Sequence, residues 1–171
     1  MYQVTQNATS CEFNDGEKRL RIAFVNTEIV RISYIEGASF PDLKNHLVTA
    51  TADFDGFRVA QVGDNFVITT DALKLSISKA TGAIRFMDTS GRVLQQEPPS
   101  GGKWLTRKEV FRNVYDNSIA IEAGQNIDGA RADAEPIERV FDRHAFEAKL
   151  EFTFTEGEAL FGLGSHEEGY G

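Results

Sequence analysis

Residues 144–157 read HAFEAKLEFTFTEG, and this stretch decides the fold class. Apolar side chains occupy every second position from Phe146 to Phe154, and charged or hydroxyl side chains occupy the positions between them. Successive side chains of a strand point to opposite faces, whereas a helix would distribute the phenylalanines around its circumference. The stretch therefore predicts an antiparallel β-strand with one face buried and the other in solvent.

The same period-two pattern recurs along the chain. Residues 20–24 and 30–34 alternate on either side of a polar break at Asn26-Thr27, which is typical of a β-hairpin. The other predicted strands are residues 66–70, 73–78, 84–86, 93–94 and 119–121, with turns at Thr81-Gly82 and at residues 88–91. Several one-sided strands need a second layer to bury their apolar faces. We therefore expect an all-β fold, an antiparallel β-sandwich with little helix.

Two segments interrupt the strand pattern. Residues 96–108 read QEPPSGGKWLTRK, and their paired prolines and glycines predict an irregular loop. Residues 126–143 carry charges of mixed sign, which favours a solvated connection with a helical turn after Pro136. Because the chain shows no internal repeat and no dividing linker, we expect residues 1–171 to form a single domain.

Composition excludes several classes of partner and site. With 26 acidic and 18 basic residues, the formal net charge of −8 argues against nucleic acid and anionic membrane surfaces as partners. No apolar run approaches the ~20 residues that cross a bilayer, and residues 1–10 lack the features of a signal peptide. Cys11 is the only cysteine, which excludes an intrachain disulfide and suits a reducing compartment. We therefore expect a cytoplasmic protein.

Residues 157–171, GEALFGLGSHEEGYG, gather residue types that could perform chemistry. His166, Glu167 and Glu168 are potential metal ligands, but no second histidine stands at ligand spacing, and no metal site is predicted. The two glutamates are adjacent and point to opposite faces of an extended chain, so they form a poor acid and nucleophile pair. The glycine spacing lacks the lysine of a phosphate loop and carries two negative charges, which excludes phosphate.

Nucleophilic catalysis has little support in the sequence. Ser165 precedes His166, but no strand-turn-helix elbow surrounds it, and Cys11 lies in a polar stretch typical of a tolerated thiol. Trp104, in the loop rich in proline and glycine, has two interpretations. It anchors that loop, or its aromatic face stacks on a sugar ring.

The order of these features resembles the N-terminal domain of glycoside hydrolase family 31, the α-glucosidase and α-xylosidase family. An early strand ending in VRISY (residues 30–34) precedes residues 70–97. These contain a threonine-led strand, a turn with lysine and glycine, an apolar-aromatic strand and an aspartate-glycine turn, in the family's order. The family's aromatic-Gly-Leu-Gly element matches residues 161–164, and Ser165 stands where many members have glutamate. The resemblance runs from about residue 18 to the last residue.

The resemblance implies a galactose-mutarotase-like β-sandwich beside a (β/α)8 barrel that carries the catalytic aspartates. A barrel alone needs roughly 250 residues, so no catalytic residue is expected in this chain, and residues 157–171 would begin the junction to the barrel. The implied reaction is hydrolysis, with retention, of an α-linked oligosaccharide or glycoside, without metal or organic cofactor. His166, Glu167, Glu168 and Trp104 are the implied substrate-proximal residues, helping to shape the pocket.

Three alternative functions remain open at this point. The first is a free-standing carbohydrate-binding module, which Trp104 and the many phenylalanines support. The second is a mutarotase-like enzyme, which needs an acid/base pair within one sandwich. The third is a sandwich that only mediates interactions.

Overall fold

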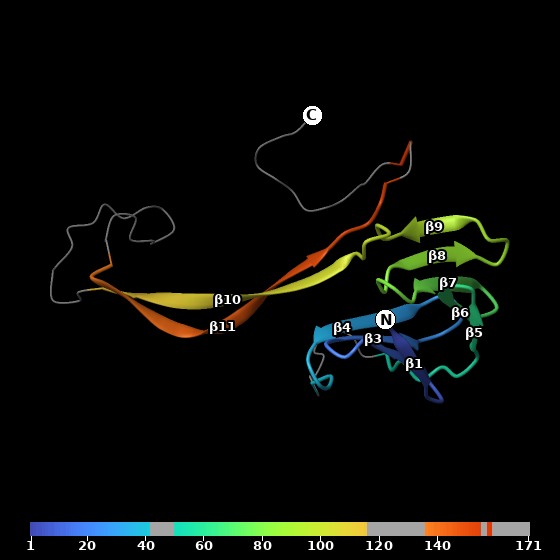
Figure 1. Ribbon diagram of the computed structural model, residues 1–171, viewed down its shortest axis with the longest axis horizontal. Coiled ribbons are helices and arrows are strands. Elements are labelled where there is room, and N and C mark those ends of the chain that lie inside the picture. Colours follow the sequence, from blue (N-terminus) through green and yellow to red (C-terminus); the bar gives the residue numbers. More distant parts are fainter. Residues whose placement is uncertain (42–49, 116–135, 155–156, 159–171) are drawn as a thin grey trace. The chain divides into compact units, whose positions relative to one another are not determined.

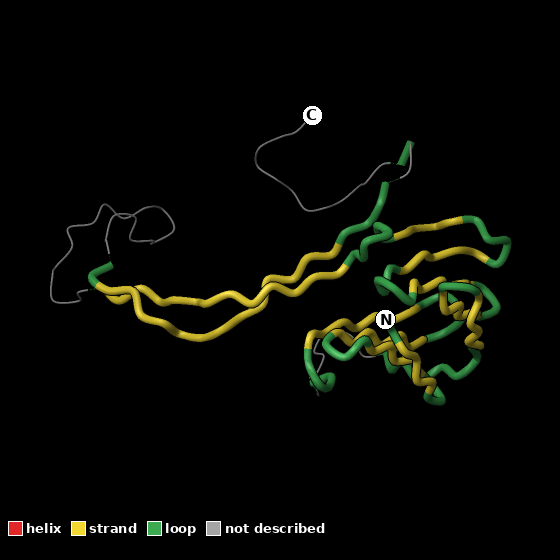
Figure 2. Tube along the Cα trace, in the orientation of Figure 1, coloured by secondary structure: helices red, strands yellow, loops and turns green. Residues whose placement is uncertain are grey.

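The computed structural model describes residues 1–41, 50–115, 136–154 and 157–158 of the chain. Every regular element in these ranges is a β-strand (Figures 1 and 2). The predicted all-β class is therefore confirmed for the described residues. The part of the chain that is described contains no helix that could cross a lipid bilayer. Contacts along the chain divide it into two compact units, Met1–Lys103 with Lys149–Gly171, and Trp104–Ala148.

The first unit contains a four-stranded antiparallel sheet in the order β1-β2-β3-β4. Its strands are β1 (Gln3–Gln6), β2 (Ser10–Asn14), β3 (Lys18–Phe24) and β4 (Val30–Glu36). Ile22 pairs with Ile32 and Leu20 with Tyr34, so the predicted hairpin forms in the register that aligns its apolar positions. The Asn26 side chain accepts the amides of Glu28 and Ile29 at 2.8 Å, which closes the turn.

A five-stranded antiparallel sheet in the order β5-β6-β7-β8-β9 completes this unit. Its strands are β5 (Arg58–Val62), β6 (Asn65–Thr69), β7 (Leu73–Ser78), β8 (Ile84–Asp88) and β9 (Val93–Gln96). The predicted turn between β7 and β8 contains Gly82 with φ 70°, and the Gly82 amide donates to the Ser78 carbonyl at 2.8 Å. Glycine adopts this left-handed conformation without steric cost, so Gly82 allows the chain to turn back from β7 to β8.

The apolar faces of the two sheets pack together into one core. The side chains that are fully buried in it come from both sheets: Cys11, Phe13, Leu20, Ile22, Phe24, Ile68, Leu75, Ile77 and Ile84. Phe13 of β2 and Phe66 of β6 place their ring centroids 5.3 Å apart, which joins the two layers directly. The predicted β-sandwich is therefore confirmed, and its core comes from the alternating apolar positions of β2, β3, β6, β7 and β8.

The second unit is a two-stranded sheet of β10 (Lys103–Val114) and β11 (Glu138–Leu150). The expected loop at residues 96–108 is wrong at both ends, because β9 includes Gln96 and β10 begins at Lys103. Prolines and glycines shape only residues 97–102, and the strand-forming side chains after them start a long strand. The helical turn expected after Pro136 is also wrong, because β11 begins two residues later at Glu138.

The strand predicted from residues 144–157 is confirmed as far as Leu150, but the predicted burial of its apolar face is wrong. Phe146 is 58% exposed and Leu150 is 62% exposed, and Phe154 beyond the strand is 56% exposed. Alternation defines an apolar face, but it does not state which element covers that face. The predicted strand at residues 119–121 lies outside the described residues.

Candidate functional site

The residues that the sequence singled out fall in different parts of the chain. His166, Glu167 and Glu168 lie outside the described residues. Trp104 is the second residue of β10 and is half-buried, in a strand rather than in a loop. It directly follows Lys103, one partner of a buried ion pair.

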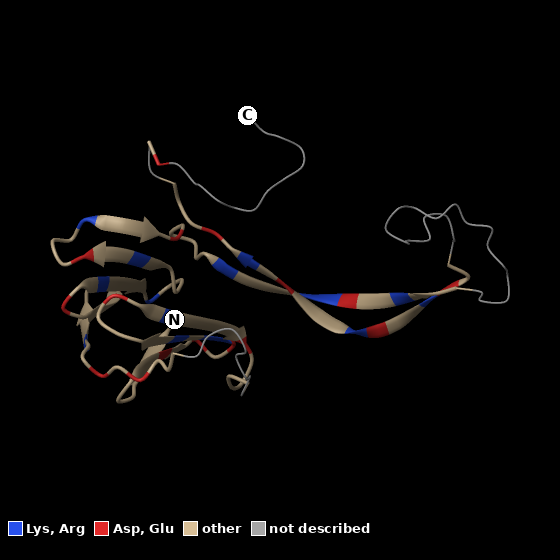
Figure 3. Cartoon of the chain, turned by 180° about the vertical axis from the view of Figure 1, so that it is seen from behind, with Lys and Arg blue, Asp and Glu red and all other residues tan. Residues whose placement is uncertain are grey.

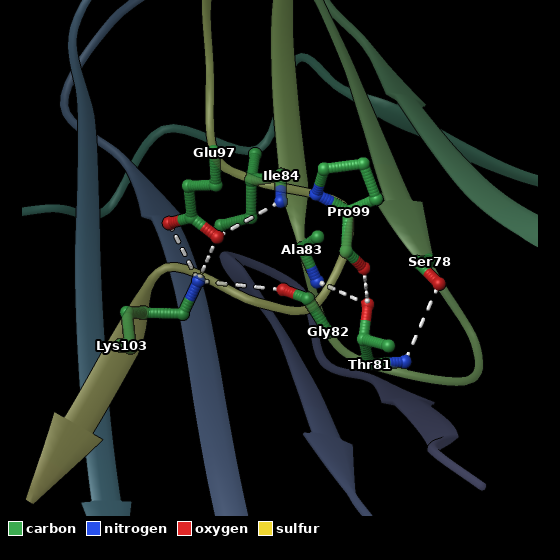
Figure 4. Close-up of polar contacts among 8 residues, drawn as sticks. All are labelled: Ser78, Thr81, Gly82, Ala83, Ile84, Glu97, Pro99 and Lys103. Atoms are coloured by element: carbon green, nitrogen blue, oxygen red, sulfur yellow. Dashed lines mark hydrogen bonds and ion pairs between the residues drawn. The ribbon is translucent and has the colours of Figure 1, made fainter. Parts of the chain in front are cut away.

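The ion pair joins the two ends of the segment that leads from β9 to β10 (Figure 4). The Nζ atom of Lys103 lies 2.6 Å and 2.5 Å from the two carboxylate oxygens of Glu97 and also donates to the Gly82 carbonyl at 3.3 Å. Oε2 of Glu97 accepts the Ile84 amide at 3.0 Å. The side chains of Glu97 and Lys103 are only 2% and 10% exposed. This arrangement ties the start of β10 to the β7–β8 turn and to β8.

Burial controls the electrostatics of this pair. Loss of water lowers the pKa of Lys103, and the hydrogen bond to Glu97 acts in the opposite direction. Among the described residues, no buried side-chain nitrogen or oxygen lacks a hydrogen-bond partner. A buried charge pair whose partners are all satisfied fits a structural role and leaves no group ready to attack a substrate.

Thr81 extends the same network on the turn side (Figure 4). Its hydroxyl donates to the Pro99 carbonyl at 2.9 Å and accepts the Ala83 amide at 3.3 Å, while its amide donates to the Ser78 hydroxyl at 3.3 Å. The hydrogen bond from Thr81 to Pro99 therefore links the turn that follows β7 to the proline-glycine segment.

A cavity of about 240 Å³ opens beside the ion pair on the five-stranded sheet. Its polar lining includes Asn65, Ser76, Ser78, Arg85 and Gln96. Arg85 donates from Nε to Oε1 of Gln96 at 3.0 Å, so these two side chains already satisfy each other. The cavity is smaller than the roughly 300–1,000 Å³ of most small-molecule sites.

A larger groove of about 700 Å³ lies on the outer face of the four-stranded sheet. We call it the outer-sheet groove, and its lining consists of Asn7, Thr9, Ser10, Glu12, Arg21, Ala23, Arg31, Ser33, Tyr34, Ile35, Phe40, Pro41 and Ala52. Arg21 forms an ion pair with Glu12, with Nη2 2.7 Å and Nε 2.8 Å from the same carboxylate oxygen. The Cζ atom of Arg21 also lies 4.2 Å from the ring centroid of Phe40. An aromatic ring and a charge pair thus share one surface of ligand-sized volume.

Sequence reasoning did not single out Glu12, Arg21 or Phe40. The alternation of β2 and β3 shows that Glu12 and Arg21 are on the polar faces, but their proximity depends on the pairing register of the strands. Phe40 lies beyond the end of β4 and reaches the sheet through tertiary contact. The sequence does show that Glu12 and Arg21 carry opposite charges at outward positions of neighbouring strands, which is the pattern of a cross-strand ion pair.

Metal binding has no support in the described part of the chain. Within residues 1–41, 50–115, 136–154 and 157–158, no group of three or more histidine, cysteine, aspartate or glutamate side chains is placed to hold an ion.

Comparison with solved structures finds similar chains among carbohydrate-processing enzymes. The chain is similar to a glycoside hydrolase family 31 α-xylosidase from Xanthomonas citri, with a TM-score of 0.67 and 20% sequence identity over 94% of this chain. It also matches a cycloalternan-forming enzyme from Listeria monocytogenes, with a TM-score of 0.47 and 16% identity over 66% of this chain. The alignments cover 14% of the xylosidase and 12% of the cycloalternan-forming enzyme. No protein-family model matches this sequence.

The match to the xylosidase confirms at the level of fold the resemblance that the sequence features indicated. The described strands share the fold of a segment of that enzyme, to which 94% of this chain aligns. This chain spans 14% of the length of that enzyme.

Proposed function

We propose that this chain is the N-terminal, non-catalytic β-sandwich domain of a retaining α-glycoside hydrolase of family 31. The observation that carries the proposal is the fold match to a family 31 α-xylosidase over 94% of the chain. The ordered sequence elements at residues 70–97 and the aromatic-Gly-Leu-Gly element at residues 161–164 support it independently. A cytoplasmic location is part of the same proposal.

The exposed apolar face of β11 supports a large partner surface. Phe146 and Leu150 are 58% and 62% exposed, and strand alternation places both on one face of β11. Contiguous exposed apolar area usually marks an interface with another protein surface. In this proposal the hairpin of β10 and β11 packs against the (β/α)8 barrel of the parent enzyme.

The catalytic chemistry of the parent enzyme belongs to that barrel. Two barrel carboxylates would cleave the α-glycosidic bond of an oligosaccharide or glycoside by double displacement. Trp104 and the segment with His166, Glu167 and Glu168 would contribute to the rim of the substrate pocket. The sandwich would hold these residues in place and exclude water from one side of the pocket.

Activity measurements test the catalytic part of this proposal. The 171-residue chain and a longer protein that extends the reading frame past Gly171 would be assayed with aryl α-glucosides and aryl α-xylosides. We expect turnover by the longer protein and none by the 171-residue chain. Turnover by the 171-residue chain alone would contradict the non-catalytic assignment, and an inactive, folded longer protein would contradict the enzyme class.

Melting experiments test the interface. Phe146→Ser with Leu150→Ser should lower the Tm of the longer protein, because these side chains would be buried against the barrel. The same changes should leave the Tm of the 171-residue chain unaltered, since both side chains are exposed there. Val62→Ser, at a position that is 58% exposed on β5, is the matched control and should change neither protein. Equal Tm values for the longer protein and its hairpin variant would refute the proposed contact.

A further inference from the structure

The outer-sheet groove has an ordered floor. Across β2, β3 and β4 the register aligns Ser10 with Ala23 and Arg31, and Glu12 with Arg21 and Ser33. These six positions form two parallel rows on the face of the sheet that does not contact the core. The outward face of such a sheet is ordinarily solvated, and in this chain a groove of about 700 Å³ lies over it.

Phe40 forms the aromatic wall of the groove, and it contacts Arg21 on the floor. The guanidinium group of Arg21 stacks against Phe40 while Nε and Nη2 of Arg21 bond to Oε1 of Glu12. Arg21 is thus fixed from two directions, which reduces the entropy lost when a ligand orders the site. Because both recorded contacts converge on Oε1, the pair itself leaves Oε2 of Glu12 available as a hydrogen-bond acceptor in the groove.

The charges in the groove select a class of ligand. Two arginines and one glutamate give the lining a formal charge of +1, although the whole chain carries −8. Glu12 of β2 lies beside Arg21 in one row of the floor, where its carboxylate would repel an anion. A carboxylate acceptor, guanidinium donors and hydroxyl groups around an aromatic ring suit a neutral ligand that has hydroxyls on its edge and C–H groups on its face.

We infer that the outer-sheet groove is a binding site for a neutral oligosaccharide, separate from any catalytic pocket. In this site Phe40 contacts the apolar face of one sugar ring, and Glu12, Arg21 and Arg31 bind hydroxyl groups. Its described lining comes from residues 7–41 and from Ala52, so the site does not require the catalytic barrel. The inference is therefore independent of the proposed enzymatic role and can fail or succeed without it.

NMR titration of the 15N-labelled 171-residue chain tests the site. Maltotriose and xylotriose serve as neutral probes, and inorganic phosphate serves as the anionic probe. We expect saturable shifts of amides in β2, β3 and β4 for at least one saccharide at up to about 20 mM, the range of a weak surface site. Saturable shifts with phosphate alone, or shifts that map to β10 and β11, would overturn the inference.

Variants separate binding from folding. Phe40→Ala and Glu12→Gln should each weaken saccharide binding at least about tenfold, because they remove the aromatic wall and the charged acceptor. Arg85→Ala is the matched control, since Arg85 lies on the outer face of the other sheet and is exposed. Chemical shifts elsewhere in the spectrum report whether each variant stays folded. Unchanged affinity in both folded groove variants, or equal loss in the Arg85 control, would overturn the assignment.

Discussion

Lys103 and Glu97 form a buried ion pair, with the ammonium nitrogen 2.6 Å and 2.5 Å from the two carboxylate oxygens, where the proline-glycine segment gives way to β10. The pair joins Glu97, the residue that follows β9, to Lys103, the first residue of β10. Because Oε2 of Glu97 also accepts the Ile84 amide, each change at this pair has a distinct expected effect on stability.

Lys103→Met should destabilise the sandwich strongly. The change removes the ammonium group and leaves the buried Glu97 carboxylate with its hydrogen bond from the Ile84 amide. A buried charge that loses its partner costs about 3–5 kcal/mol. The double variant Glu97→Gln with Lys103→Met should lose less, because glutamine keeps an acceptor for Ile84 without a charge. Urea unfolding gives the free energy of unfolding for each variant.

The control for this pair is an exposed ion pair of the same unit. Lys149 and Glu151 are 2.7 Å apart, with side chains 66% and 44% exposed. Lys149→Met should change the free energy of unfolding by at most about 1 kcal/mol. If Lys103→Met costs no more than Lys149→Met, the pair between Glu97 and Lys103 is not buried as described.

Gly82→Ala should cost much more than Gly63→Ala. Both glycines have left-handed backbone, with φ 70° and 56°. A Cβ at Gly82 would lie 2.8 Å from the buried ring of Tyr2, whereas a Cβ at Gly63 meets nothing within 4 Å. We expect a loss of about 1 kcal/mol at Gly63 from backbone strain alone and about 2–4 kcal/mol at Gly82. Equal losses in thermal or urea unfolding would show that Tyr2 does not pack on this turn.

The thiol of Cys11 should be inert in the folded protein. Burial raises its pKa to about 12 from 9.0, and its side chain is inaccessible in the core. At pH 8 this shift alone lowers the thiolate fraction roughly a thousandfold, and the thiolate is the reactive form. Labelling with iodoacetamide at pH 8 should therefore be slow without denaturant and fast in concentrated urea. Equally fast labelling in both conditions would exclude Cys11 from the core.

The turn between β8 and β9 should respond to acid through Asp88. The Ser90 hydroxyl donates to this carboxylate at 2.6 Å, and this bond, with others from Ser90 and Arg92, lowers the Asp88 pKa from 3.8 to about 2. The folded state thus favours the ionised carboxylate. Its contribution to stability is present above pH 3.8 and is lost as the pH falls toward 2.

Carbon-detected NMR titration measures this pKa directly. Ser90→Ala removes the largest cause of the shift and should move the Asp88 pKa back toward 3.8. Ser76→Ala, on the neighbouring strand β7, is the control and should leave it unchanged. An Asp88 pKa near 3.8 in the unaltered protein would show that the turn does not hold its hydrogen bonds in solution.

The strands with local hydrogen-bonding partners could be predicted from sequence. The alternation in residues 20–34 and the turn residues Asn26 and Gly82 are adjacent to the strands they connect, so pattern and turn chemistry define those hairpins. The start of β10 at Lys103 was missed because the glycines before it also predict a loop. The buried contacts of Lys103 with Gly82 and Glu97 depend on tertiary packing that the local pattern does not report.

The ligand-sized surfaces could not be predicted in the same way. The outer-sheet groove depends on the register between β2 and β3 and on Phe40, which reaches Arg21 from outside the sheet. The apolar face of β11 could be read from the sequence, but nothing in the alternation of Phe146 and Leu150 reports that it would be exposed in this chain. The sequence-predicted residues His166, Glu167 and Glu168 lie outside the described residues.

The charges along the hairpin carry a consequence for handling the protein (Figure 3). Aromatic residues that are exposed on β10 and β11 alternate with lysine, arginine and glutamate, and Lys108 pairs with Glu147 across the two strands at 3.2 Å. A charged strand opposes the addition of a further strand from another molecule, because each copy would bring its charges into a low-dielectric contact. Replacing Lys108 and Glu147 by threonine should therefore raise the tendency of this hairpin to pair with strands of other molecules.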